Sequence, residues 1–173
     1  MDVVVQHIAA YFNAPFDENG EAWGKISALK VLEEFLPDGR ILTFFLTIIA
    51  DPKEYDMARV LLLKLLETDP FPEARRRIGE CVATAFPGEE NWTVRCWLGR
   101  AVAAYTDIPG TREIAIACVL NQSEYEDVRH NCLSGLNVAE PMVLDTLKLL
   151  AIEDSTLGIA ARRQLEKLST DSY

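Results

Sequence analysis

Apolar residues recur along the chain at the three- and four-residue spacing of amphipathic helices, in segments separated by short stretches rich in Pro, Gly and Asp. No segment of comparable length keeps the alternation typical of a β-strand. The pattern predicts helices in pairs. The first helices of the pairs are predicted at Val3–Phe12, Ile41–Ile49, Pro72–Phe86, Thr111–Leu120 and Pro141–Ile152. The second helices are predicted at Ala22–Phe35, Tyr55–Glu67, Trp92–Tyr105, Tyr125–Leu136 and Leu157–Leu168.

The predicted connections are short and carry helix-ending residues, as in Pro37-Asp38-Gly39, Asp69-Pro70, Pro87-Gly88 and Pro109-Gly110. Short connections of this kind are typical of helical bundles and solenoids. The chain has 173 residues and is 49% hydrophobic, which is enough for one continuous core. We therefore expect a single all-α domain over residues 1–168 and a frayed polar tail over residues 169–173.

A repeat underlies the pairing of helices. The stretch Glu124–Leu136 recurs in weaker form in the other predicted second helices, and the positions that match Arg129 are Lys25, Arg59, Arg95 and Ala161. These marker positions are separated by 34, 36, 34 and 32 residues. Self-similarity at this period indicates stacked helical units that bury their apolar faces only against one another.

The Val-Arg-x-x-Cys-Leu-x-x-Leu motif at residues 128–136 and the Ala58-Arg59 pair resemble HEAT-like (armadillo-type) repeats. The resemblance covers essentially the whole chain, although Lys25 and Ala161 depart from the expected Arg. It implies a right-handed α-solenoid of about five helical hairpins whose second helices line a concave surface. Tetratricopeptide repeats share the period, but their Trp, Leu-Gly-Tyr and Ala/Pro positions are not met, so this family ranks second.

The formal net charge is −10, which argues against general nucleic-acid binding and favours a basic partner. The longest apolar run, Ile41–Ala50, is too short to cross a membrane and contains two threonines. The N-terminal stretch lacks the basic region of a signal peptide. We therefore expect a soluble cytoplasmic protein with no membrane partner.

The sequence offers little for catalysis or for metal binding. It has four cysteines without a C-x-x-C pair and two histidines, so no zinc spacing is present. Glycine-rich phosphate loops, H-E-x-x-H motifs and nucleophile elbows are also missing. Adjacent carboxylates such as Glu33-Glu34 and Glu89-Glu90 fit a solvated face or a helix cap. We expect a non-enzymatic protein with no cofactor and no metal.

The marker residues Lys25, Arg59, Arg95 and Arg129 lie at the edge of the apolar stripe of each second helix. We expect them to pair with acidic residues of neighbouring loops, and in this way to stack along the molecule. The clearest loop acids in the sequence are Asp51 and Asp154.

The other side of the second helices supplies the candidate binding residues. Their helical register predicts an open face with apolar groups, including Val60, beside a basic row. Contiguous exposed apolar residues mark interfaces, and Trp and Arg are frequent hot spots. The candidate partner-binding residues are Trp23, Ile26, Lys30, Leu61, Lys64, Trp97, Arg100 and His130. The competing interpretation is that the groove closes and that these residues belong to the core.

Three functions fit these features. The first is a non-catalytic protein-binding module, in its specific version a bacterial immunity or antitoxin-type inhibitor of a basic effector such as a nuclease. The alternative is a nucleic-acid-binding protein, for which similarity to HEAT-like DNA glycosylases implies a basic concave face with Lys30, Lys64, Arg100, Arg162 and Arg163. The third is an assembly chaperone, including a role like that of the HEAT-like bilin lyases.

Overall fold

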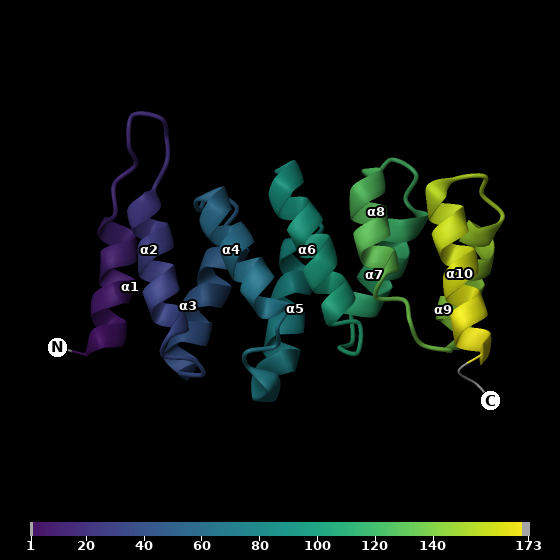
Figure 1. The fold of residues 1–173 in the computed structure, drawn as a ribbon, viewed down its shortest axis with the longest axis horizontal. Helices are drawn as coiled ribbons and strands as arrows, with labels where there is room; N and C mark the ends of the chain where they lie inside the picture. The colour runs from purple at the N-terminus through teal and green to yellow at the C-terminus, as the bar shows by residue number, and fades with distance from the viewer. Residues whose placement is uncertain (1, 171–173) are drawn as a thin grey trace.

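A computed structural model describes residues 2–170, which are all-helical, with ten α-helices, one short 3-10 helix and no strand in that range (Figure 1). The helices that open each pair are α1 (Val3–Asn13), α3 (Gly39–Ala50), α5 (Arg75–Ala85), α7 (Thr111–Leu120) and α9 (Pro141–Ala151). The helices that close each pair are α2 (Trp23–Glu33), α4 (Asp56–Leu66), α6 (Trp92–Ala104), α8 (Glu126–Leu133) and α10 (Thr156–Thr170).

The helices form two rows. Each odd-numbered helix packs on the even-numbered helix that follows it, and the even-numbered helices contact one another in the order α2, α4, α6, α8, α10. The odd-numbered helices α3, α5, α7 and α9 contact one another in the same sequential way. Figure 1 shows the pairs succeeding one another from the N-terminal end to the C-terminal end of the long axis. The main contacts between helices therefore join helices of the same pair or of neighbouring pairs.

All ten predicted helices are present, and most of their boundaries differ from the prediction by one or two residues. Three of the differences affect the description below. The predicted helix Pro72–Phe86 begins as the 3-10 helix Pro72–Ala74, because Ala74, with φ −112°, interrupts the helical backbone before α5. Helix α8 ends at Leu133 instead of Leu136. Helix α10 continues through Thr170, so residues 169 and 170, which were predicted to belong to a frayed tail, are helical. Residues 171–173 of the predicted tail lie outside the described range.

The early end of α8 lets the chain cross closely over α6. Gly135 follows α8, and a Cβ placed on it would lie 2.5 Å from Ala103 Cα and 2.6 Å from Ala103 O. Only a residue without a side chain allows the two backbones this approach. Leu136, directly after this glycine, is nevertheless fully buried, so the turn still contributes to the core.

The core runs continuously between the two rows and contains Phe45, Leu62, Leu98, Val128 and Leu147. Val60, which the helical register placed on the open face, is buried with 3% of its surface exposed. The prediction for Val60 was wrong because α4 has neighbours on both flanks, α2 and α6, and their side chains narrow its open face. Within the described range, no helix is both long and apolar enough to span a membrane.

Candidate functional site

A ladder of ion pairs joins each even-numbered helix to the loop of the next pair. Each basic marker residue binds a glutamate that lies just before the start of the following even-numbered helix. The nitrogen–oxygen distances are 2.6 Å for Lys25–Glu54, 2.5 Å for Arg59–Glu89, 2.5 Å for Arg95–Glu124 and 3.5 Å for Arg129–Glu153. The pairing of the markers with loop acids is therefore confirmed.

The marker residues also fix the end of the odd-numbered helix of their own pair. Arg59 donates to Ile49 O, and Arg129 donates to Val119 O, in both cases through Nε and Nη2. These carbonyls lie at the C-terminal ends of α3 and α7, where main-chain oxygens have no helical partner. The ladder thus gives these two carbonyls hydrogen-bond donors, and its cations have partners inside the protein.

The acidic partners expected from the sequence, Asp51 and Asp154, do not form the ladder. Asp51 is the C-terminal cap of α3, and its carboxylate accepts a hydrogen bond from Lys53 N at 2.9 Å. A residue at that point of the loop closes a local turn and lies before the segment that faces the neighbouring pair. In this loop the residue that faces the marker comes later, at Glu54, whereas in the last loop it is Glu153, directly before Asp154.

Electrostatics within the ladder are strong at Glu124. The hydrogen bonds from Arg95 outweigh the effect of burial and hold the pKa of Glu124 below its ordinary value. For Glu54, burial acts to raise the pKa, but the hydrogen bond from Lys25 and the Tyr55 amide bring the net change to a lower pKa. Both carboxylates are therefore stabilised as anions in the folded protein.

The candidate partner-binding residues all lie on even-numbered helices. Trp23, Lys30, Lys64 and Arg100 are exposed. The other four candidates are half-buried: Ile26, Leu61, Trp97 and His130. The three apolar ones among them pack against the core. The open face is thus narrower than the helical register alone predicted.

Trp97 is the centre of the part that the fold brings together. Lys64 Nζ lies 4.5 Å from the centroid of the Trp97 ring, and Arg100 Cζ lies 4.6 Å from it. Arg100 also donates to both carboxylate oxygens of Glu67 at 2.6 and 2.9 Å. This cluster joins α4 to α6, and its cations are already engaged by groups of the protein.

His130 and Trp23 lie apart from this cluster. His130 Nε2 is 2.9 Å from Thr156 Oγ1 and 3.7 Å from Glu126, so it belongs to a contact between α8 and α10. Trp23 is the first residue of α2 and is 64% exposed. The eight candidates therefore do not form one compact site.

A row of exposed large side chains follows the N-terminal ends of the even-numbered helices, which lie along the upper edge of Figure 1. We name four of them the aromatic edge: Trp23 (64% exposed), Met57 (48%), Trp92 (49%) and Tyr125 (55%). Sequence reasoning selected only Trp23 from this row as a candidate. Trp92 and Tyr125 precede the marker by three and four residues, whereas the candidate positions begin two residues before it, at Trp23.

Carboxylates accompany the aromatic edge. Glu18, Glu90 and Asp127 are exposed, and within residues 2–170 none of the three has a hydrogen-bond or ion-pair partner. Asp127 belongs to the first turn of α8, where a carboxylate complements the helix dipole. The edge therefore combines exposed apolar surface with uncompensated negative charge.

Hydrogen bonds between successive pairs hold this edge in place. The Tyr55 hydroxyl donates to Glu21, and Asn91 Nδ2 donates to Asp56 at 2.5 Å. Further along, the Thr156 hydroxyl donates to Glu126. These hydrogen bonds join neighbouring loops, so they hold the backbone that carries the aromatic edge.

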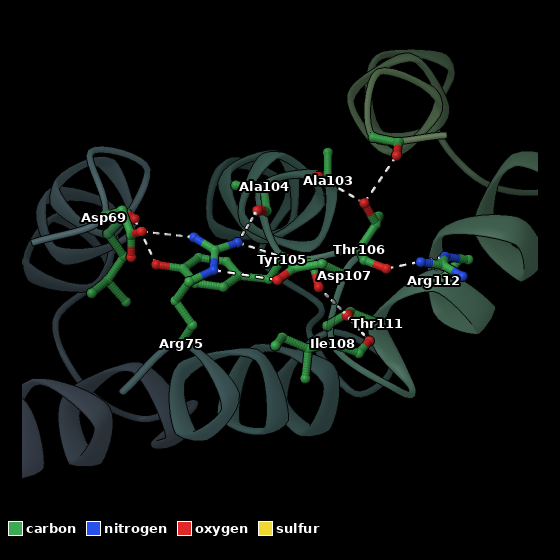
Figure 2. Close-up of polar contacts among 12 residues, drawn as sticks. Asp69, Arg75, Ala103, Ala104, Tyr105, Thr106, Asp107, Ile108, Thr111 and Arg112 are labelled. Atoms are coloured by element: carbon green, nitrogen blue, oxygen red, sulfur yellow. Dashed lines mark hydrogen bonds and ion pairs between the residues drawn. The ribbon is translucent and has the colours of Figure 1, made fainter. Parts of the chain in front are cut away.

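The opposite ends of the even-numbered helices carry a polar network around Arg75 (Figure 2). Arg75 lies 2.9 Å from Asp69 and 2.7 Å from Asp107, and it donates to Ala104 O at 3.1 Å. Its guanidinium stacks 4.7 Å from the centroid of Tyr105, whose hydroxyl donates to Leu66 O. This network ties α5 to the C-terminal ends of α4 and α6.

The run Arg75-Arg76-Arg77 does not form one basic site. Arg76 pairs with Glu80 one turn later on α5, and Arg77 donates to Thr43 Oγ1 at 3.0 Å. Each of the three guanidiniums therefore has its own partner.

Reactive groups are sparse in the described part of the chain. It holds no cluster of three or more His, Cys, Asp or Glu residues that could bind a metal. All four cysteines are free, and burial raises the pKa of Cys81 to about 11, which disfavours its thiolate.

No protein-family model, curated protein or solved structure matches the chain. The HEAT-like resemblance therefore stays a prediction.

Proposed function

We propose that the chain is a non-catalytic docking protein that uses the row of even-numbered helices as its binding face. In this proposal, the helix pairs form a right-handed α-solenoid of five HEAT-like hairpins. The sequential contacts within both rows and the regular ladder of marker residues support this description.

The aromatic edge is the observation that carries the proposal. Trp, Tyr and Met are enriched at protein–protein interfaces, and Trp and Tyr are frequent hot spots. Here the two Trp, one Tyr and one Met of the aromatic edge are exposed, and hydrogen bonds join the loops beside them. Because the loops beside these side chains are already joined to one another, binding requires little ordering of the backbone that carries them.

The charge beside the aromatic edge favours a basic partner protein. Glu18, Glu90 and Asp127 are available for Lys or Arg side chains, and exposed indoles also attract such cations. The specific version that we propose is a cytoplasmic bacterial immunity or antitoxin-type inhibitor of a basic effector such as a nuclease. Its anchors are Trp23 and Trp92. The Trp97 cluster joins α4 to α6 and in this way stabilises the binding face.

The test compares capture of partners from the native host by the wild-type chain and by a Trp23→Ala/Trp92→Ala variant, with identification by mass spectrometry. The expected result is a basic protein that binds the wild type and is lost, or bound at least about tenfold more weakly, by the double variant. Matched removal of apolar surface elsewhere, with Met142→Ala and Leu149→Ala on α9, is expected to leave capture unchanged. Capture that is insensitive to Trp23 and Trp92 would contradict the proposal.

Two of the five cations of the nucleic-acid alternative are already engaged by the protein. Arg100 is paired with Glu67, and Arg162 donates to Ala151 O at 2.5 Å. Phosphate contacts require cations that are free to bind the backbone. Retention of the chain on random duplex DNA at low ionic strength would restore this alternative.

A further inference from the structure

Arg163 on α10 is the one arginine in residues 2–170 whose guanidinium has no hydrogen bond or ion pair with the protein. The other arginines of that range bind carboxylates, carbonyls or a hydroxyl. Lys167, one turn later on the same helix, is also exposed and without a partner. Two uncommitted cations therefore lie side by side on α10.

Both cations line a hollow of about 390 Å³ between the C-terminal end of α8 and α10. Its other polar wall residues are Ser134, Asn137 and Gln164, and Ala160 and Leu168 contribute apolar surface. No carboxylate is among the residues that line it. The hollow thus carries positive charge in a chain whose net charge is −10.

The walls of this hollow are fixed by hydrogen bonds. Gln164 Nε2 donates to Leu136 O at 2.6 Å and to Leu133 O at 3.3 Å, which joins α10 to the end of α8. Ser134 Oγ donates to Asn131 O at 2.6 Å. The part of α10 that carries the two cations is therefore held against the end of α8.

Ser134 also borders a second hollow, of about 450 Å³, lined by Glu67, Arg100, Ala103, Ala104 and Asn131. We name the two hollows together the α6–α10 groove. Glu67 compensates Arg100 in the second hollow, so the free positive charge is concentrated at the α10 end. The two hollows meet at Ser134 and combine polar walls with small apolar residues, which suits a peptide segment of several residues.

We propose that the α6–α10 groove binds an acidic peptide segment of a partner protein, with its carboxylates against Arg163 and Lys167. A guanidinium presents a planar fork of donors that matches a carboxylate, and a neighbouring ammonium adds a second charge. The remainder of the segment lies across Ser134 toward Asn131. The charge preference is opposite to that of the aromatic edge, so this site does not depend on the proposed function.

The experiment measures fluorescence anisotropy of a labelled oligoglutamate peptide with the full chain, alongside an oligolysine peptide of equal length. The variant is Arg163→Gln/Lys167→Gln, which removes two exposed charges. The matched control is Lys53→Gln/Arg76→Gln, which removes the same charge from exposed positions outside the groove. Amide NMR spectra of wild type and both variants verify the fold and locate the peptide.

We expect the oligoglutamate peptide to bind the wild type and the control equally, and the Arg163→Gln/Lys167→Gln variant at least about tenfold more weakly. Peptide-induced shifts at Ser134, Asn137 and Gln164 are expected as well. Equal binding by the groove variant and the control, tighter binding of oligolysine, or shifts elsewhere would overturn the proposal. Complete displacement of the peptide by inorganic phosphate at constant ionic strength would also overturn it, because it would indicate a simple anion site.

Discussion

Arg95 on α6 donates through Nε and Nη2 to the carboxylate of Glu124 in the loop before α8, with a shortest distance of 2.5 Å. The same guanidinium donates through Nη1 to Phe86 O and Glu89 O. One side chain therefore joins the start of α6, the loop before it and the loop before α8. We therefore expect the ion pairs of the ladder to contribute to the stability of the fold.

Removing the carboxylate with Glu124→Ala is expected to lower the free energy of unfolding by about 3 kcal/mol, because Arg95 is left largely buried without its charge partner. Urea denaturation followed by circular dichroism measures the change. The control is Asp145→Ala, which removes an exposed partner of Lys148 and is expected to cost less than about 0.5 kcal/mol. Losses of equal size would argue against a stabilising role for the ladder.

The stability of the protein is expected to fall at acid pH in a way that depends on Glu124. Its pKa is lowered in the folded state by Arg95, so its contribution is fully present above its unfolded pKa of about 4.3 and is lost as the pH falls through the lower folded value. Urea denaturation of the wild type and Glu124→Gln from neutral to acid pH tests this. The variant should lose less stability on acidification, and parallel profiles would contradict the assignment.

Trp97 and Trp23 are expected to differ in their effect on stability. Trp97→Ala removes a half-buried ring that contacts Lys64 and Arg100, and we expect a loss of about 2 kcal/mol in the free energy of unfolding. Trp23→Ala removes a ring that is 64% exposed and should cost less than about 0.5 kcal/mol. Equal losses, measured by chemical denaturation, would contradict the distinction between the supporting cluster and the aromatic edge.

Gly135→Ala is expected to destabilise the protein by about 1–3 kcal/mol, because the added methyl would meet the backbone of Ala103, which cannot move without shifting α6. Gly39→Ala is the matched control, since nothing lies within 4 Å of a Cβ at that position. The control is expected to change stability by less than about 0.5 kcal/mol. Thermal unfolding of both variants gives the comparison, and a neutral Gly135→Ala would disprove the close crossing.

Helical periodicity and the marker spacing were sufficient to predict the helices and the pairing of the marker residues. They could not identify the partner acids, because loop position relative to the next helix pair depends on how the pairs stack. Asp51 lies too early in its loop, whereas Glu54 and Glu124 directly precede Tyr55 and Tyr125, at matching positions of two repeats.

The width of the open face also lay beyond the sequence. A helical wheel shows which residues share a side of α4, but it does not contain the distance to α2 and α6, which buries Val60 and half-buries Leu61. The aromatic edge was missed for a different reason. Trp92 and Tyr125, like Trp23, lie at the N-terminal ends of even-numbered helices, and only the parallel alignment of these helices (Figure 1) brings those ends to one edge of the molecule.

The position of Glu89 has a consequence for how the molecule opens. Glu89 sits in the loop of one helix pair, yet it is the charge partner of Arg59 in the preceding pair, where the guanidinium is almost completely shielded from water. If the α5–α6 pair detached alone, Arg59 would lose its charge partner. Unfolding of a helix pair in the middle of the chain therefore breaks ion pairs with both neighbouring pairs. We expect adjacent pairs to unfold together.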